Sequence, residues 1–95
     1  MKITKDLVIF VTGGASGLGE ATVRLLASLG CKIGIADMNE SRLNQIETEL
    51  GKENVIGILC DVTKEEDMKN AIELTVKTFG TLHVAIACAG VAFVV

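Results

Sequence analysis

Apolar runs alternate along this chain with segments whose apolar residues recur at helical spacing. The runs cover residues 7–11, 33–36, 55–60 and 83–88. They are largely continuous instead of alternating with polar residues, which is typical of strands buried on both faces of a parallel sheet. The helical segments between these strands are too long for hairpins, so we expect right-handed crossover connections between parallel strands. The sequence predicts an α/β fold: the first half of a Rossmann-like doubly wound parallel sheet, with strand order 3-2-1-4, two helices on one face and the third on the other.

Capping residues indicate where the helices begin and end. The first helix is expected to begin at Gly17 and to stop before Gly30, and Asn39 is expected to cap the second. Thr63 followed by Glu66 matches the capping box, so the third helix is expected to begin there. The buried face of this third helix is expected to carry Met68, Ile72, Val76 and Phe79.

The composition fits one small domain, which we expect to span residues 1–95 and to end after the fourth strand. Hydrophobic residues make up 49% of the 95 residues, an excess for so short a chain. We therefore expect it to meet another segment or a second copy in a homo-oligomer. The net charge of −3, with the charges dispersed, gives no basic face for nucleic acid.

Cysteine usage and hydropathy bear on the compartment. Cys31, Cys60 and Cys88 are odd in number and form no C-x-x-C pair, so reduced thiols inside a cell are the simplest account. The longest apolar run, residues 84–95, is too short to span a bilayer. Residues 1–5 lead almost directly into the first predicted strand, so we expect no signal or transit peptide within this sequence. The expected location is intracellular, cytoplasmic or mitochondrial, with no membrane span.

A glycine-rich loop, TGGASGLG at residues 12–19, joins the first strand to the first helix. Glycines remove the Cβ atoms that keep a backbone away from an anion, and the helix start supplies unpaired N–H groups and a positive dipole end. The spacing G-x-x-x-G-x-G and the Glu20 that follows it argue against a P-loop. A tight structural turn is the alternative reading, but it needs fewer glycines. We expect Gly13, Gly17 and Gly19 to bind cofactor phosphates.

Acidic residues follow the second and third strands. Asp37 is placed to accept hydrogen bonds from the hydroxyls of an adenosine ribose, although it could instead only cap the next helix. Its neighbours Met38 and Asn39 are uncharged, so a 2′-phosphate would meet a carboxylate, and NAD is preferred to NADP as the cofactor. Arg42, one helical turn later, weakens that preference. Asp61 could meet an adenine amino group or support the turn, and both readings stay open.

Four features together resemble the short-chain dehydrogenase/reductase family. They are the glycine loop, Asp37, the pair Asp61-Val62 and the triplet Cys88-Ala89-Gly90. Within the family, the loop and residues 88–92 are most similar to the type-2 3-hydroxyacyl-CoA dehydrogenases, also described as 17β-hydroxysteroid dehydrogenases. The resemblance implies an NAD-dependent oxidoreductase that moves hydride between NAD(H) and a secondary alcohol or ketone, with a small hydrophobic or CoA-linked substrate.

The resemblance also implies roles for individual residues. Ser16 and Leu18 would contact the cofactor phosphates, and Asp37 the adenosine ribose. Asp61 and Val62 would contact the adenine. The ribose on the nicotinamide side would be held by Cys88, Ala89 and Gly90.

Two departures from the family pattern leave other functions open. The family usually has Asn just before Ala-Gly or one place earlier, where this chain has Cys88 and Ala87. The family's chemistry uses a Ser, together with a Tyr and a Lys at Y-x-x-x-K spacing, but this sequence contains no tyrosine. Ser41 and Lys77 fall on predicted helices, so no catalytic residue is assigned. The alternatives are a non-catalytic nucleotide-binding or interaction fragment and an S-adenosylmethionine-dependent transferase.

Two further residues have structural explanations. His83 is the single histidine, and we interpret it as a polar residue at a strand end and not as a metal ligand. Cys88 is expected to be a small, buried and unreactive thiol. The fourth strand is expected to form an exposed apolar edge of the sheet.

Overall fold

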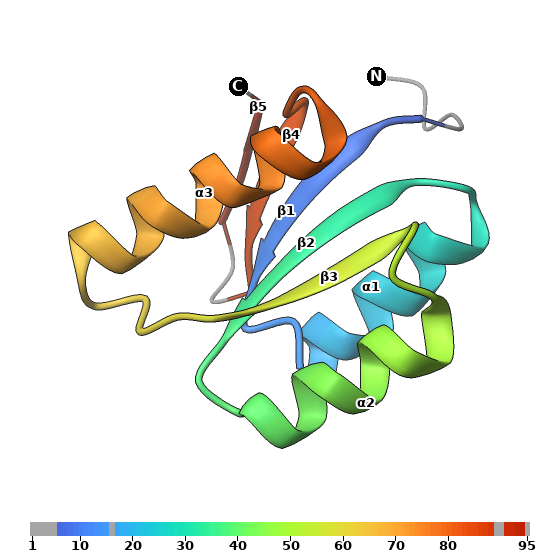
Figure 1. Cartoon of the computed structure of the whole chain (residues 1–95), viewed down its shortest axis with the longest axis horizontal. Helices are drawn as coiled ribbons and strands as arrows, with labels where there is room; N and C mark the ends of the chain where they lie inside the picture. Colours follow the sequence, from blue (N-terminus) through green and yellow to red (C-terminus); the bar gives the residue numbers. More distant parts are fainter. Residues whose placement is uncertain (1–5, 16, 89–90, 95) are drawn as a thin grey trace.

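The computed structural model describes residues 6–15, 17–88 and 91–94. Strands and helices alternate up to the fourth strand, and a fifth strand follows (Figure 1). The elements are β1 (Val8–Thr12), α1 (Gly17–Ser28), β2 (Lys32–Asp37), α2 (Glu40–Leu50), β3 (Val55–Leu59), α3 (Glu65–Phe79), β4 (Val84–Ala87) and β5 (Val91–Val94).

The sheet has the order β3-β2-β1-β4-β5. Strands β1 to β4 are parallel to their neighbours, with Ile9 opposite Ile33 on one side and Val84 on the other. The predicted order 3-2-1-4 is confirmed for these four strands. The strand order reverses at β1, which has β2 on one side and β4 on the other. The segments that leave the carboxyl ends of β1 and β4 therefore run apart from each other at that end of the sheet.

The expectation that the sheet ends at an exposed fourth strand is wrong, because a fifth strand, β5, pairs antiparallel with β4. Only residues 88–90 separate the two strands. A parallel return needs a crossover of a dozen or more residues, whereas a connection this short permits only a reversal of direction. The apolar run at residues 84–95 therefore contributes two adjacent strands, and β5 covers the hydrogen-bonding edge of β4.

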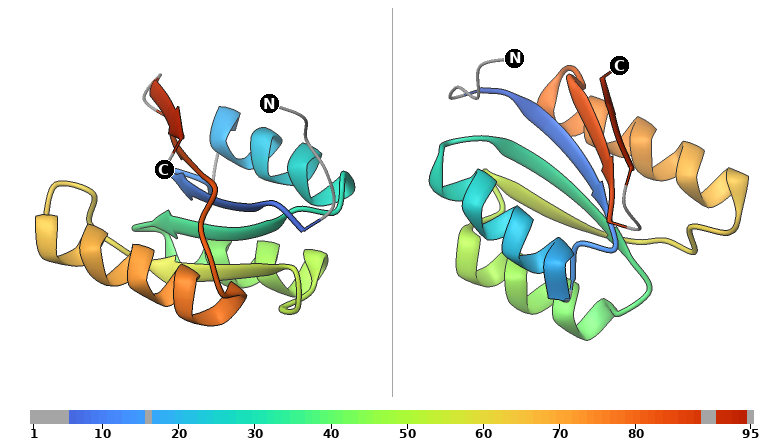
Figure 2. Two further views of the ribbon diagram at one scale, coloured as in Figure 1. Left: turned by 90° about the horizontal axis from the view of Figure 1, so that it is seen from above. Right: turned by 180° about the vertical axis from the view of Figure 1, so that it is seen from behind.

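Helices α1 and α2 lie on one face of the sheet and α3 on the other, as predicted (Figures 1 and 2). Alternate residues of β1 divide between the two faces: Ile9 and Val11 pack with α1 and α2, whereas Phe10 packs with α3. The larger core cluster comprises Ile9, Val11, Ala15, Val23, Leu26, Cys31, Ile33, Ile35, Leu43, Ile46, Val55 and Val84. The smaller cluster comprises Phe10, Ala36, Cys60, Ala71 and Ala85.

The face that α3 turns to the sheet differs from the predicted one. Its fully buried residues are Ala71 and Thr75. In the predicted stripe, Met68, Ile72 and Phe79 are half-buried and Val76 is 38% exposed. Close packing explains the rotation, because a Cβ built on Gly34 of β2 would lie 2.2 Å from Thr75 Oγ1. The Thr75 hydroxyl donates to Ala71 O at 2.9 Å, which allows a polar residue to face the sheet.

One helix cap is confirmed and one is wrong. Asn39 caps α2, with its side-chain oxygen accepting from Arg42 N at 3.1 Å. The predicted capping box at Thr63 does not form, and Lys64 stands at the N-cap of α3 with no side-chain cap hydrogen bond. Asp61 competes for the threonine, since Thr63 Oγ1 donates to Asp61 Oδ1 at 2.6 Å.

His83 joins the start of β4 to β1. Its Nδ1 accepts from Val8 N at 2.9 Å, and its backbone N–H donates to Val8 O at 2.9 Å. Val8 is 2% exposed, so water cannot easily replace the imidazole as an acceptor. The reading of His83 as a structural residue at a strand end agrees with these contacts.

Replacing His83 with alanine should leave the Val8 N–H unpaired. We expect a loss of about 1–2 kcal/mol in the free energy of unfolding, measured by urea denaturation with circular dichroism. The matched variant His83→Asn keeps an acceptor at the δ position and should recover at least half of the loss. Unchanged stability in His83→Ala would contradict the role given to this contact.

Candidate functional site

A cleft opens where the carboxyl ends of β1, β2 and β4 meet the turn that follows β3. Its volume is about 330 Å³. In open α/β sheets, ligands bind beyond the carboxyl ends of the strands, where the strand order reverses. The residues that line it are Thr12, Gly13, Asp37, Met38, Cys60, Val62 and Cys88.

The glycine loop passes from this cleft to the start of α1. Gly13 N donates to Ala36 O at 2.8 Å, which holds the loop against β2. Where α1 begins, a Cβ built on Gly19 would lie 1.9 Å from Gly13 O, so the helix and the loop touch through backbone alone. The first N–H groups of α1, at Gly17, Leu18 and Gly19, carry the positive end of the helix dipole. Leu18 is 75% exposed beside them.

Asp37 connects β2 to the loop. Its Oδ2 accepts from Ala15 N at 3.1 Å, and its Oδ1 accepts from Asn39 N at 2.9 Å. Because Asn39 is the N-cap of α2, Asp37 is not the capping residue. Each carboxylate oxygen has capacity for a second hydrogen bond. The side chain lines the cleft and holds the loop at the same time.

A chain of ion pairs links α1 to α2 beside the loop. Glu20 binds both Arg42 and Arg24, and Arg24 Nη2 also lies 2.6 Å from Glu49 Oε2. Arg42 Nε donates to Ala15 O at 3.4 Å, so the guanidinium and the Asp37 carboxylate contact the main chain of the same loop residue.

Asp61 supports the turn before α3. Its Oδ1 accepts from the Thr63 hydroxyl and from Thr63 N at 2.9 Å, and these bonds hold the pKa of the Asp61 carboxyl below its usual value. Asp61 is not among the residues lining the cleft, whereas Val62, half exposed, is. Of the two readings left open for Asp61, the observed contacts agree with support of the turn.

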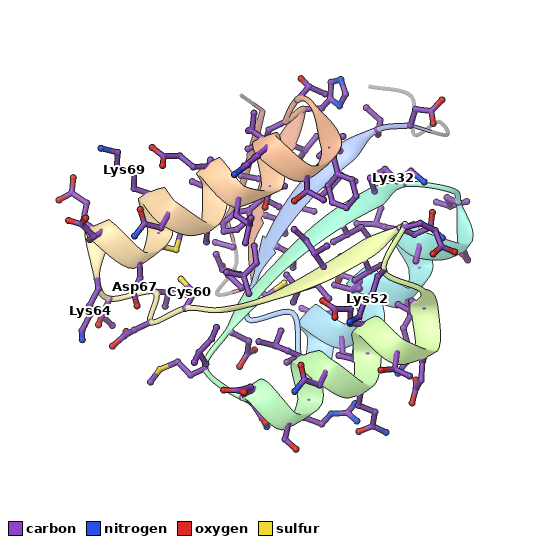
Figure 3. The ribbon with its side chains drawn as sticks, viewed as in Figure 1. Lys32, Lys52, Cys60, Lys64, Asp67 and Lys69 are labelled. Atoms are coloured by element: carbon purple, nitrogen blue, oxygen red, sulfur yellow. The ribbon has the colours of Figure 1, made fainter. Side chains whose placement is uncertain are left out.

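Cys60 and Cys88 line the cleft from opposite sides of β1. Cys60 follows β3, on the side of the turn nearest α3 (Figure 3), and its Sγ lies 3.8 Å from Met68 Sδ. Burial raises the pKa of both thiols above the ordinary value. Thiols with a raised pKa are protonated at neutral pH and are poor nucleophiles. Cys88 is half-buried and not fully buried as expected, and its lack of reactivity stays a prediction.

The structure brings only some of the predicted site residues together. Gly13, Asp37, Val62 and Cys88 line one cleft, with Gly17, Leu18 and Gly19 at the adjoining helix start. Ser16, Ala89 and Gly90 lie outside the described residues. Sequence reasoning missed Thr12 and Cys60 as lining residues, and gave Met38 no contact. Their positions in the sequence could have indicated that they line the cleft, because each ends or directly follows a strand whose carboxyl end points to the cleft.

The described residues, 6–15, 17–88 and 91–94, contain neither a candidate metal centre nor a candidate membrane span. No group of three or more His, Cys, Asp or Glu residues there could hold a metal ion. No helix there is long and apolar enough to cross a membrane.

The contact between Gly19 and Gly13 O predicts a position-specific effect of alanine. Gly19→Ala must displace the loop backbone, and we expect a loss of about 2–3 kcal/mol in the free energy of unfolding. Gly17→Ala is the matched control: its Cβ meets nothing within 4 Å, but φ is +56°, which costs roughly 1 kcal/mol. Urea denaturation measures both, and equal losses would contradict the steric account.

The ion pairs of Glu20 predict a pH dependence of stability. Hydrogen bonds from Arg42 and then Arg24 lower the pKa of Glu20 below its ordinary value of 4.5. A lowered folded-state pKa gives stabilisation that is complete above the unfolded-state pKa and is lost as the pH falls through the folded-state pKa. The difference in unfolding free energy between wild type and Glu20→Gln should therefore stay constant from neutral pH to about pH 5 and shrink below it. Shrinkage already complete at pH 5 would contradict the assignment.

Comparison with known proteins identifies relatives over nearly the whole chain. A family model described as short chain dehydrogenase matches residues 7–95. The secoisolariciresinol dehydrogenase of Forsythia intermedia is 40% identical over 84 residues, which cover 88% of this chain and 30% of that protein. The 3-hydroxyacyl-CoA dehydrogenase type-2 of Drosophila melanogaster is 42% identical over 88 residues, which cover 93% of this chain and 34% of that protein.

A solved structure shares the fold. The 3-ketoacyl-(acyl-carrier-protein) reductase from Brucella melitensis, complexed with NADH, superposes with a TM-score of 0.79 at 28% identity, over 83% of this chain and 32% of that one. The chain thus spans about a third of the length of the relatives it matches. From the family match, the parallel order β3-β2-β1-β4 and the glycine loop at the start of α1, we conclude that this chain belongs to the short-chain dehydrogenase/reductase family of NAD(P)-using oxidoreductases and corresponds to its N-terminal, cofactor-binding portion.

Proposed function

We propose that this chain binds NAD(H) in the cleft at the carboxyl ends of β1 to β4. The observation that carries the proposal is Asp37, which lines the cleft and also holds the glycine loop through Ala15 N. The Asp37 carboxylate, which can bind a ribose, therefore lies beside a helix start that can bind an anion. A dinucleotide needs these two groups at neighbouring positions, because its phosphates and ribose are covalently joined.

The residues fit the parts of the cofactor in the following way. The N–H groups of Gly17, Leu18 and Gly19 bind the phosphates, with Ser16 expected to assist. The free hydrogen-bonding capacity of the Asp37 oxygens accepts the ribose hydroxyls. Val62 packs on the adenine, and Asp61 holds the turn that presents Val62. The nicotinamide-side ribose lies toward Cys88, with Ala89 and Gly90 as its expected neighbours.

Charge favours NAD over NADP in this cleft. The lining residues include a carboxylate and no lysine or arginine among those the structure describes. A 2′-phosphate on the adenosine ribose would lie against Asp37, and the repulsion would not be offset by a cation in the cleft. NAD carries two hydroxyls there, which a carboxylate can accept in hydrogen bonds.

The reaction class follows from the family and from its relatives. Bound NAD supplies the nicotinamide ring that accepts or donates hydride. We propose that the whole protein oxidises a secondary alcohol or reduces the corresponding ketone, with a hydrophobic or CoA-linked substrate. The curated relatives named dehydrogenases and the reductase named with NADH support this reading. This chain's share is to bind and orient the cofactor, since its sequence contains no tyrosine to move the proton.

A second candidate is a nucleotide-binding fragment that does no chemistry. The lack of tyrosine favours it for residues 1–95 taken alone. Cofactor binding without turnover distinguishes the two: a chain that binds NADH but never reduces NAD in the presence of a 3-hydroxyacyl-CoA supports the second candidate, whereas turnover supports the first.

Binding is best tested by titration with NADH. The chain has no tryptophan or tyrosine, so the nicotinamide fluorescence is measured against a dark protein background. We expect saturable binding that weakens by about tenfold in Asp37→Ala, because hydrogen bonds to a charged acceptor are lost. Glu73→Gln removes one negative charge from the exposed side of α3 and should leave the affinity within twofold.

The opposite outcomes would overturn the proposal. Absence of saturable NADH binding by the folded wild-type chain would refute cofactor binding itself. Equal weakening by Asp37→Ala and Glu73→Gln would refute the assignment of Asp37, because it would show an effect of net charge alone.

A further inference from the structure

Arg42 is the arginine that contacts the loop beside the proposed ribose site. Its Nε donates to Ala15 O at 3.4 Å, and Ala15 N donates in turn to Asp37 Oδ2 at 3.1 Å. Guanidinium and carboxylate therefore flank one loop residue. Lys64, by contrast, projects outward from the turn before α3 (Figure 3). If a 2′-phosphate entered beside Asp37, Arg42 is the described side chain placed to neutralise it.

In the observed arrangement, each of the three guanidinium nitrogens of Arg42 has a hydrogen-bond partner. Its Nη2 donates to Glu20 Oε1, its Nη1 to Gln45 Oε1 and its Nε to the loop carbonyl. The Glu20 pair is the one that cancels its charge. Glu20 is only partly exposed, at 20% for its side chain, so water screens the pair incompletely. A phosphate that approached Arg42 through Nη2 would therefore have to compete with the Glu20 carboxylate for the guanidinium charge.

We propose that Glu20 is a specificity-determining residue, which excludes NADP by holding Arg42 away from the 2′-phosphate position. The inference rests on the proposed binding of NAD(H) and adds a second determinant to the repulsion by Asp37. Glu20 does not line the cleft, and it acts through Arg42. Arg24 keeps a second acceptor, Glu49, so removal of the Glu20 charge releases Arg42 without leaving Arg24 unpaired.

The isosteric variant Glu20→Gln tests this directly, by calorimetric titration with NAD and with NADP. The affinity for NADP should rise about tenfold, the usual scale for one charge-assisted phosphate contact, while the affinity for NAD stays within twofold. The double variant Glu20→Gln/Arg42→Gln should lose the gain. The control Glu49→Gln breaks the neighbouring ion pair of Arg24 and should leave both affinities unchanged.

A second measurement does not depend on the stability of Glu20→Gln. In the wild-type background, Arg42→Gln should change NADP affinity by less than twofold, because Arg42 is already withheld. A tenfold loss would show that Arg42 serves the phosphate despite Glu20 and would overturn the inference.

The outcomes separate this inference from the proposed function. Binding of NAD by wild type, with NADP affinity unchanged in a folded Glu20→Gln variant, overturns the role of Glu20 alone. Failure of wild type to bind either dinucleotide overturns the proposed function and the inference with it.

Discussion

The close approach of two backbone segments is the constraint on which the rest of this structure depends. The carbonyl oxygen of Gly13 occupies the space that any Cβ at position 19 would need. This contact folds the loop tightly over the start of α1, so the helix leaves β1 at an angle that packs Val23 and Leu26 onto the sheet. The same tight path brings Ala15 to the end of β2, where Asp37 accepts its N–H. Core packing and the geometry of the cleft therefore share one steric cause.

Electrostatics then determines what such a cleft can accept. The helix start offers positive N–H groups, whereas the end of β2 offers a carboxylate, so the two halves of the site favour a ligand with an anionic part and a hydroxylated part. The arginines next to the loop do not alter this balance. Arg42 and Arg24 are held by Glu20 and Glu49 across α1 and α2. The positive charges of these two arginines, which could otherwise bind a further phosphate, instead form ion pairs that connect the two helices.

Much of the fold could be predicted from the sequence, because the spacing of apolar residues and the positions of glycines determine helices, strands and turns through local interactions. The errors arose where tertiary contacts compete with local preference. Thr63 has the right type and spacing for a cap, but Asp61 takes its hydroxyl. Thr75 looks polar in the sequence, yet its bond to Ala71 O and the bare surface of Gly34 let it face the sheet.

The site was predictable in outline for the same reason. Residues at strand ends converge by topology, so Asp37 and Cys88 could be placed together from their positions alone. Strand β5 and the partners of Arg42 depend on segments meeting in space, which a local pattern does not encode.

The central claim is that a dinucleotide occupies the cleft beside Asp37, and amide chemical-shift mapping of the isotope-labelled chain during titration with NAD tests it most directly. The account predicts saturable shifts at Ala15, at the start of α1 and at Val62. Lys52, which precedes β3 at the opposite end of that strand from Cys60 (Figure 3), should not shift. Saturable shifts confined to the region of Lys52, or none at all, would contradict the account.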